Sequence, residues 1–139
     1  MGMSVNCKTN IFKTMLGLTQ NLSLAPTAYI GLSTVQAGSN VNAFVEPSGA
    51  AGYTRALIGN YNAPVSQLFT VDGDGRASNK SIIYFPEATD GWGEIKSFGI
   101  FQSESGGVPL VTGDLTASVN VPANYVPLFR VGALQMSFE

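Results

Sequence analysis

The chain has 139 residues, of which 45% are hydrophobic and 12% are charged, and its formal net charge is −2. This length fits one domain with its own core, and the acidic balance excludes the basic surface that binding to a nucleic-acid backbone requires. No apolar run approaches the ~18 residues of a membrane-spanning helix, so we expect neither nucleic acid nor a membrane among the partners.

The first predicted element is an amphipathic helix at residues 4–22. Ile11, Met15, Leu18 and Leu22 follow one another at spacings of four, three and four, which places them in one apolar stripe. An amphipathic helix must cover an apolar surface, either a sheet of its own chain or a neighbouring subunit. We expect it to cover a sheet of its own chain.

Residues 27–139 contain short apolar runs separated by turns rich in Gly, Pro, Asn and Asp, which predicts about seven or eight antiparallel strands. The expected strands lie at residues 28–33, 53–59, 67–71, 81–85, 94–102, 108–115 and 129–138. Strands and helices do not alternate, so a parallel sheet is excluded. We predict a mainly β chain, residues 1–139 as a single domain, with an antiparallel β-sandwich at 27–139 behind the N-terminal helix.

The residue types that most often perform catalysis are scarce. Histidine is absent and Cys7 is the only cysteine, which excludes an intrachain disulfide, a thiolate zinc site and every nucleophile paired with histidine. Lys8 and Lys13 interrupt the region where a secretory signal would be apolar, so we expect a protein made in the cytoplasm. The sequence predicts no enzymatic activity, no cofactor and no metal; no catalytic, cofactor-binding or metal residue is assigned, and the binding residues are unknown.

Carboxylates gather around the only tryptophan. Glu87, Asp90 and Glu94 lie close in sequence to Trp92, a combination that suggests a sugar site with a carboxylate pair. The favoured interpretation is a strand end and a turn, with solvated carboxylates and with Trp92 capping the core.

A second acidic segment, Asp72-Gly-Asp74-Gly-Arg76, resembles the start of a calcium-binding loop. That loop requires an oxygen ligand at its fifth position, Gly at its sixth and Glu at its twelfth. Here those positions hold Arg76, Ala77 and Ile83. A hairpin turn is the favoured interpretation, and a weak surface calcium site is the alternative.

An ordered series of short motifs resembles a known group of proteins. The motifs are Tyr29–Ser33, Glu46–Gly49, Gly52–Ala56, Ile83–Ala88, Trp92-Gly93, Ile95–Ile100, Gly106-Gly107, Leu110–Leu115 and Phe129–Leu134. They are similar to the motifs of small bacteriophage virion structural proteins that are labelled tail fibre or minor tail proteins. The resemblance spans nearly the whole chain and implies a role in the virion without catalysis. The sequence lacks the heptads and collagen repeats of a fibre shaft, so we expect a compact module.

The composition agrees with a role in assembly. A charged fraction of 12%, about half of the usual ~25%, leaves an uncharged polar surface that is suited to permanent contacts with neighbours. The leading hypothesis is a non-enzymatic virion structural protein that is associated with the tail, collar or neck, packs against other virion proteins and forms homo-oligomers. The alternatives are a capsid-decorating protein and a carbohydrate- or receptor-binding module of a fibre, with loops around Trp92 or Tyr61 as its binding face.

Overall fold

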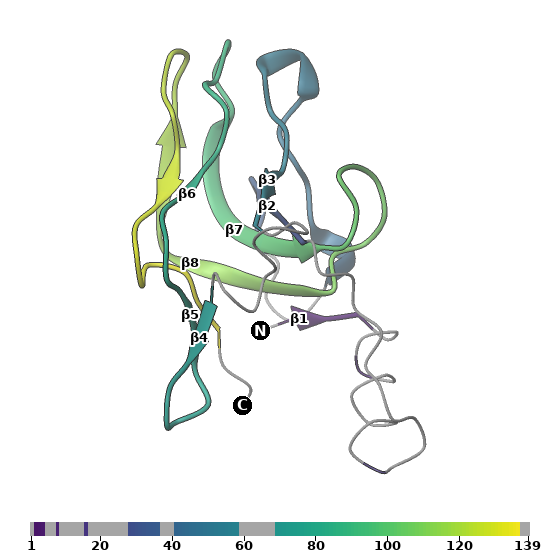
Figure 1. The fold of residues 1–139 in the computed structure, drawn as a ribbon. Helices are drawn as coiled ribbons and strands as arrows, with labels where there is room; N and C mark the ends of the chain where they lie inside the picture. The colour runs from purple at the N-terminus through teal and green to yellow at the C-terminus, as the bar shows by residue number, and fades with distance from the viewer. Residues whose placement is uncertain are drawn as a thin grey trace.

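The computed structural model describes residues 2–4, 8, 16, 28–36, 41–58 and 69–136. Its strands are β1 (Gly2–Met3), β2 (Tyr29–Ser33), β3 (Ala56–Leu57), β4 (Phe69–Val71), β5 (Ala77–Asn79), β6 (Ile83–Tyr84), β7 (Gly93–Phe101), β8 (Val111–Val121), β9 (Leu128–Phe129) and β10 (Gln135–Met136). Two 3₁₀ helices, η1 (Val41–Ala43) and η2 (Gly49–Ala51), lie between β2 and β3 (Figure 1). Neither helix is long and apolar enough to cross a membrane, and the same holds for every described part of the chain.

The strands form three sheets, and every pairing is antiparallel. The large sheet has the order β1-β8-β7-β2-β3, a second sheet has the order β10-β5-β4, and β6 pairs with β9 in a two-stranded ribbon. The prediction of a mainly β chain with antiparallel pairing is therefore confirmed.

The predicted N-terminal helix at residues 4–22 is not supported. Gly2 and Met3, which directly precede it, pair with Thr112 and Val111 of β8 as a strand. Within 4–22 the structure describes only residues 4, 8 and 16, and the rest of the predicted helix lies outside the described residues. Leu16, beside the expected apolar stripe, is 69% exposed, so it does not contribute to a buried helix face.

A large bulge bends the central β7–β8 hairpin. Ile95 stands opposite Val119, whereas Ser97 stands opposite Asp114, so four residues of β8 (115–118) stand against the single residue Lys96 of β7. Extra residues in one strand of a pair increase its twist and bend it. As a result, the hairpin curves sharply, and the end that carries Gly93 and Val121 turns toward the β6–β9 ribbon (Figure 1).

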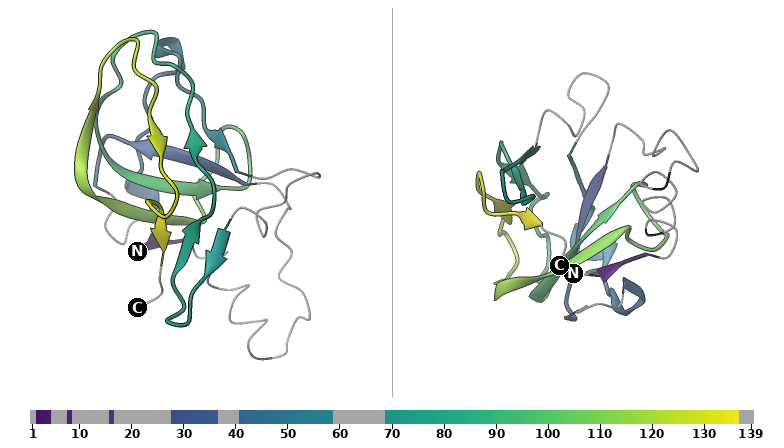
Figure 2. Two further views of the ribbon diagram at one scale, coloured as in Figure 1. Left: turned by 60° about the vertical axis from the view of Figure 1, so that its left-hand side comes forward. Right: turned by 90° about the horizontal axis from the view of Figure 1, so that it is seen from below.

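The β6–β9 ribbon lies over the large sheet as a second layer. In the left view of Figure 2 its two strands cross β2, β7 and β8 at a steep angle. Phe129 joins the layers, because its ring meets the rings of Phe85 and Phe98 edge to face, at centroid distances of 6.1 and 6.3 Å. The core between the layers contains Ile30, Leu32, Ile58, Ile83, Phe85, Trp92, Ile95, Phe98, Val121 and Leu134.

Asn79 at the end of β5 ties the second sheet to the turn before β10. Its amide nitrogen donates to the carbonyl oxygens of Ser81 (2.8 Å) and Arg130 (2.9 Å), and its amide oxygen accepts from Leu134 N–H (3.0 Å). These bonds satisfy both donors and the acceptor of a buried amide. Asn79 thus holds two chain segments together that are far apart in sequence.

We expect Gly113→Ala to lower the free energy of unfolding by about 1–3 kcal/mol, the range of overpacked core sites. A Cβ at Gly113 would lie 2.7 Å from Cζ of Phe98, whereas a Cβ at Gly73, in the exposed β4–β5 turn, meets nothing within 4 Å. Gly73→Ala is the matched control, with an expected change within about 0.5 kcal/mol. Urea unfolding followed by tryptophan fluorescence measures both; equal effects of the two variants would show that Phe98 does not press on Gly113.

Candidate functional site

Arg55 and Glu46 form an ion pair at the edge of the large sheet. Arg55 directly precedes β3, and Glu46 lies between η1 and η2. The pairing is bidentate, with Nε to Oε1 at 2.8 Å and Nη2 to Oε2 at 2.9 Å. The Arg55 side chain is 2% exposed and that of Glu46 is 27% exposed. The guanidinium is thus almost completely removed from water, which is tolerated only because the carboxylate faces it.

Two further groups complete the environment of the guanidinium. Nη1 of Arg55 donates to the carbonyl oxygen of Ser103, 2.9 Å away in the loop after β7. The guanidinium carbon also lies 3.3 Å from the centroid of the Phe101 ring, in cation–π contact. Protein acceptors therefore lie along the edge of the guanidinium, and the Phe101 ring covers one of its faces.

Tyr53 links the ion pair to β2. Its hydroxyl donates to Oε1 of Glu46 at 2.7 Å and accepts from Leu32 N–H at 2.9 Å. Gly31, next to Leu32, leaves room for this arrangement, because a Cβ there would lie 2.8 Å from Oε1 of Glu46 and 3.0 Å from the Tyr53 hydroxyl. We call Glu46, Tyr53, Arg55, Phe101 and the Ser103 carbonyl the Arg55 cluster.

The electrostatics of the cluster favour an ionised Glu46 and a neutral Tyr53. Burial raises the pKa of Glu46, but hydrogen bonds from Arg55 and Tyr53 and the charge of Arg55 outweigh burial and lower the pKa below its ordinary value. Burial, followed by the hydrogen bond to Glu46, raises the pKa of Tyr53. Both protonation states therefore suit a permanent ion pair.

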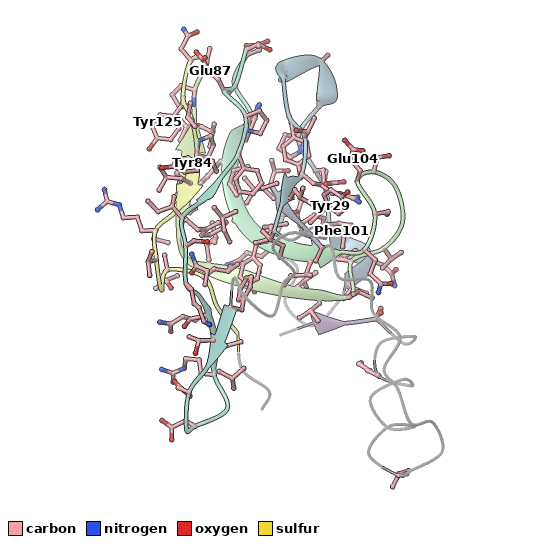
Figure 3. The ribbon with its side chains drawn as sticks, viewed as in Figure 1. Tyr29, Tyr84, Glu87, Phe101, Glu104 and Tyr125 are labelled. Carbon is pink, nitrogen blue, oxygen red and sulfur yellow. The ribbon has the colours of Figure 1, made fainter. Side chains whose placement is uncertain are left out.

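This arrangement is organised for holding loops rather than for proton transfer. Both oxygens of Glu46 already accept hydrogen bonds, and a carboxylate with a lowered pKa is a weak base. A shallow hollow of about 320 Å³ lies over the cluster, bordered by Pro47, Thr54 and residues 104–106. Phe101 and Glu104 mark this side of the molecule in Figure 3. The polar groups of the cluster form hydrogen bonds with one another, so few of them are available to a molecule bound in the hollow.

The structure places Trp92 in the core. Trp92 is 4% exposed, its indole N–H donates to the carbonyl oxygen of Ala51 at 2.9 Å, and its ring meets Tyr53 edge to face at 5.2 Å. An indole enclosed in this way cannot stack on a sugar. Glu87 and Asp90 are exposed on the turn that precedes it.

The third carboxylate near Trp92 is also exposed. Glu94, in β7, accepts a hydrogen bond from the Ser118 hydroxyl on the bulge of β8. The carboxylates predicted as an alternative sugar site thus surround a buried indole without forming a pocket with it. Tyr61, the other aromatic residue considered for a binding face, lies outside the described residues, as does Cys7.

The Asp72–Gly75 segment forms the β4–β5 turn. Oδ1 of Asp72 accepts from the backbone N–H groups of Asp74 (2.9 Å) and Arg76 (3.0 Å). The hydrogen bond from Arg76 N–H, followed by that from Asp74 N–H, lowers the pKa of the Asp72 carboxyl. Among the described residues, no group of three or more Cys, Asp or Glu side chains is placed to hold a metal ion.

Sequence reasoning did not identify the Arg55 cluster, although the sequence carries a signal for it. Arg55 interrupts an otherwise uncharged run from Tyr53 to Ile58, and a charge in a buried strand requires a partner. Glu46 is the first acidic residue of the chain and the nearest carboxylate. The pairing follows from those two facts once Arg55 is assumed to be buried.

A comparison with known protein families agrees with the resemblance that the sequence motifs indicate. A family model described as "Podophage GP4 fiber I protein gp80" matches residues 2–137 of the chain. The resemblance to small phage virion structural proteins is therefore confirmed. No curated protein matches the sequence.

We expect Arg55→Met to lower the free energy of unfolding by about 3 kcal/mol, because removing one partner leaves the half-buried Glu46 carboxylate without its counter-charge. Arg76→Met is the matched control, since Arg76 is exposed in the β4–β5 turn, and its expected effect is within about 0.5 kcal/mol. Urea unfolding at neutral pH compares the two variants. A loss below about 1 kcal/mol in Arg55→Met would mean that the ion pair contributes little to stability.

The stability that ionised Glu46 provides depends on pH. Its pKa in the folded chain lies below the ordinary 4.5, so this stabilisation is fully present above pH 4.5 and is lost as the pH falls through the folded pKa. Glu46→Gln cannot ionise and lacks this contribution at every pH. The difference in unfolding free energy between wild type and Glu46→Gln should therefore shrink as the pH falls below about 4.5. Asp72 is present in both proteins and cancels. A difference that stays constant over this range would contradict the lowered pKa.

Proposed function

Because the chain belongs to the podophage GP4 fiber I protein family, we propose that it is a structural component of the phage tail, neck or collar that acts by packing against other virion proteins. The chain is a phage virion protein of a fibre family. The family match over residues 2–137 is the observation that carries this proposal. The proposal also includes assembly of several copies of the chain and the absence of enzymatic activity.

The organisation of the described residues supports a structural role. The Arg55 cluster directs its polar groups at one another and fixes loops at the edge of the large sheet. The charge-poor surface, with charged residues at 12% of the chain, suits broad contact with neighbouring proteins. We further propose that residues 1–139 form one domain, which is supported by the single core cluster that β2, β6, β7 and β8 share.

The structure argues against one of the two alternative functions, carbohydrate binding, but does not separate the other, capsid decoration, from the favoured proposal. A carbohydrate-binding face built on Trp92 is disfavoured, because the indole is enclosed and hydrogen-bonded inside the core. A capsid-decorating role uses the same kind of protein–protein contact as a tail or neck role. The location of the protein on the particle therefore distinguishes capsid decoration from the favoured proposal.

We expect the purified chain to form a defined oligomer by light scattering, and gold-labelled antibody to mark the tail or neck of intact particles. Particles from a phage that lacks the gene are the control for the label. Label spread over the head would replace the tail or neck location with capsid decoration. Particles without label, in the presence of a working antibody, would contradict a place in the virion, and a monomer at all concentrations would contradict self-assembly.

A further inference from the structure

The β6–β9 ribbon has two apolar faces, and the described residues of the chain cover only one of them. Ile83 and Phe129, which stand opposite each other, point into the core, so the next pair, Tyr84 and Leu128, points outward. Tyr84 is 60% exposed and Leu128 is 41% exposed. Figure 3 shows Tyr84 pointing away from the ribbon, on the side opposite to the Arg55 cluster.

The exposed face continues beyond the two strands. Phe85 N–H donates to the carbonyl oxygen of Pro127 at 3.0 Å, and Ala88 N–H donates to that of Tyr125 at 2.9 Å, so the ladder extends upward in Figure 1. Because side chains alternate along a strand, Ile82 and Val126 lie on the same face as the Tyr84–Leu128 pair, one on each side of it. We call the resulting surface the outer ribbon face, and its residues are Ile82, Tyr84, Val126 and Leu128.

A contiguous apolar surface of this kind is unusual on a protein that acts alone. Single exposed apolar side chains are common, but a patch of several with a polar rim marks a contact with another molecule. Residues 81–86 and 124–129, which build the two sides of the ribbon, contain no charged side chain at all. The outer ribbon face thus has the apolar, charge-depleted centre that is typical of a protein–protein interface.

Charges of opposite sign lie at the two ends of this face. Lys80 and Arg130 are exposed at the end that carries Ile82, whereas Glu87 and Asp90 are exposed on the chain beyond the other end, past Tyr84. The face therefore has a cationic end, an uncharged apolar centre and an anionic end. A partner that complements it must present an anionic end, an apolar centre and a cationic end in that order.

A second copy of the chain, turned by half a rotation, presents that order. We propose that two copies of this chain pack outer ribbon face against outer ribbon face about a two-fold axis that passes near the Tyr84–Leu128 pair. In this orientation the Arg130 end of one copy meets the Glu87 end of the other, twice in each dimer. Parallel packing would bring like charges together and is disfavoured. The proposal specifies the contact for the self-assembly proposed above and rests on it.

The apolar centre is tested by placing a charge in it. Leu128→Lys and Tyr84→Lys should each weaken dimerisation at least about 30-fold in Kd, as expected for the centre of an interface. Val71→Lys is the matched control, because Val71 is 67% exposed in the β4–β5 hairpin, away from the ribbon. Sedimentation velocity over a range of concentrations gives the Kd of each variant, and circular dichroism verifies that each is folded.

The orientation is tested by exchanging the charges at the two ends. Arg130→Glu and Glu87→Arg should each weaken the dimer, because each places like charges together twice. The double variant restores opposite charges and should recover most of the wild-type affinity. These exposed residues lie outside the core, so the variants are expected to fold even if a lysine at the centre of the face does not allow folding.

The possible outcomes separate this inference from the proposal on which it rests. If the wild type stays monomeric at all concentrations, self-assembly itself is contradicted, and this contact with it. If the wild type assembles but Leu128→Lys and Tyr84→Lys assemble equally well, self-assembly stands and the outer ribbon face is not the contact. If both lysine variants disrupt assembly but the charge exchange fails to restore it, the two-fold antiparallel arrangement is overturned.

Discussion

The buried guanidinium of Arg55 imposes the strongest constraint on this fold. A cation that is removed from water must be surrounded by acceptors, and the chain supplies them from separate segments: Glu46 before η2 and the Ser103 carbonyl after β7. Tyr53 then connects the carboxylate to the backbone of β2 through Leu32. Ordering these loops costs conformational entropy, which the ion pair and its hydrogen bonds offset. The edge of the large sheet thus acquires a fixed shape without a long stretch of regular structure.

The other half of the molecule depends on the bulge in β8. A straight β7–β8 hairpin would leave the large sheet open on one face, whereas residues 115–118 bend it toward the β6–β9 ribbon. The ribbon fills the concave side with Phe85 and Phe129 and keeps Tyr84 and Leu128 outside. The two sides of the molecule therefore differ in character: one is held by internal charge pairing, and the other presents apolar side chains to its surroundings.

Many strand positions could be predicted from the sequence, because apolar runs bounded by Gly and Pro indicate buried strands. The segments at 28–33 and 94–102 coincide closely with β2 and β7, and the Asp72–Gly75 turn was correctly placed. The bulge could not be predicted, because the expected strand ended at residue 115, whereas β8 continues to Val121. The Arg55 cluster was missed for a different reason: a carboxylate and a guanidinium nine positions apart indicate an ion pair only when the burial of the strand is known. The N-terminal stripe is a different case, since helical periodicity alone does not establish that a face is covered, and most of residues 4–22 lie outside the described part of the chain.

The pairing of β1 with β8 determines when this protein can finish folding. Gly2 and Met3 are synthesised long before their partners Thr112 and Val111. The β7–β8 hairpin, which is local in sequence, can form as soon as it emerges, but the five-stranded sheet closes only when β1 can pair with β8. Each copy therefore completes the large sheet only after β8 has been synthesised, and truncated chains that lack β8 have no means of completing it.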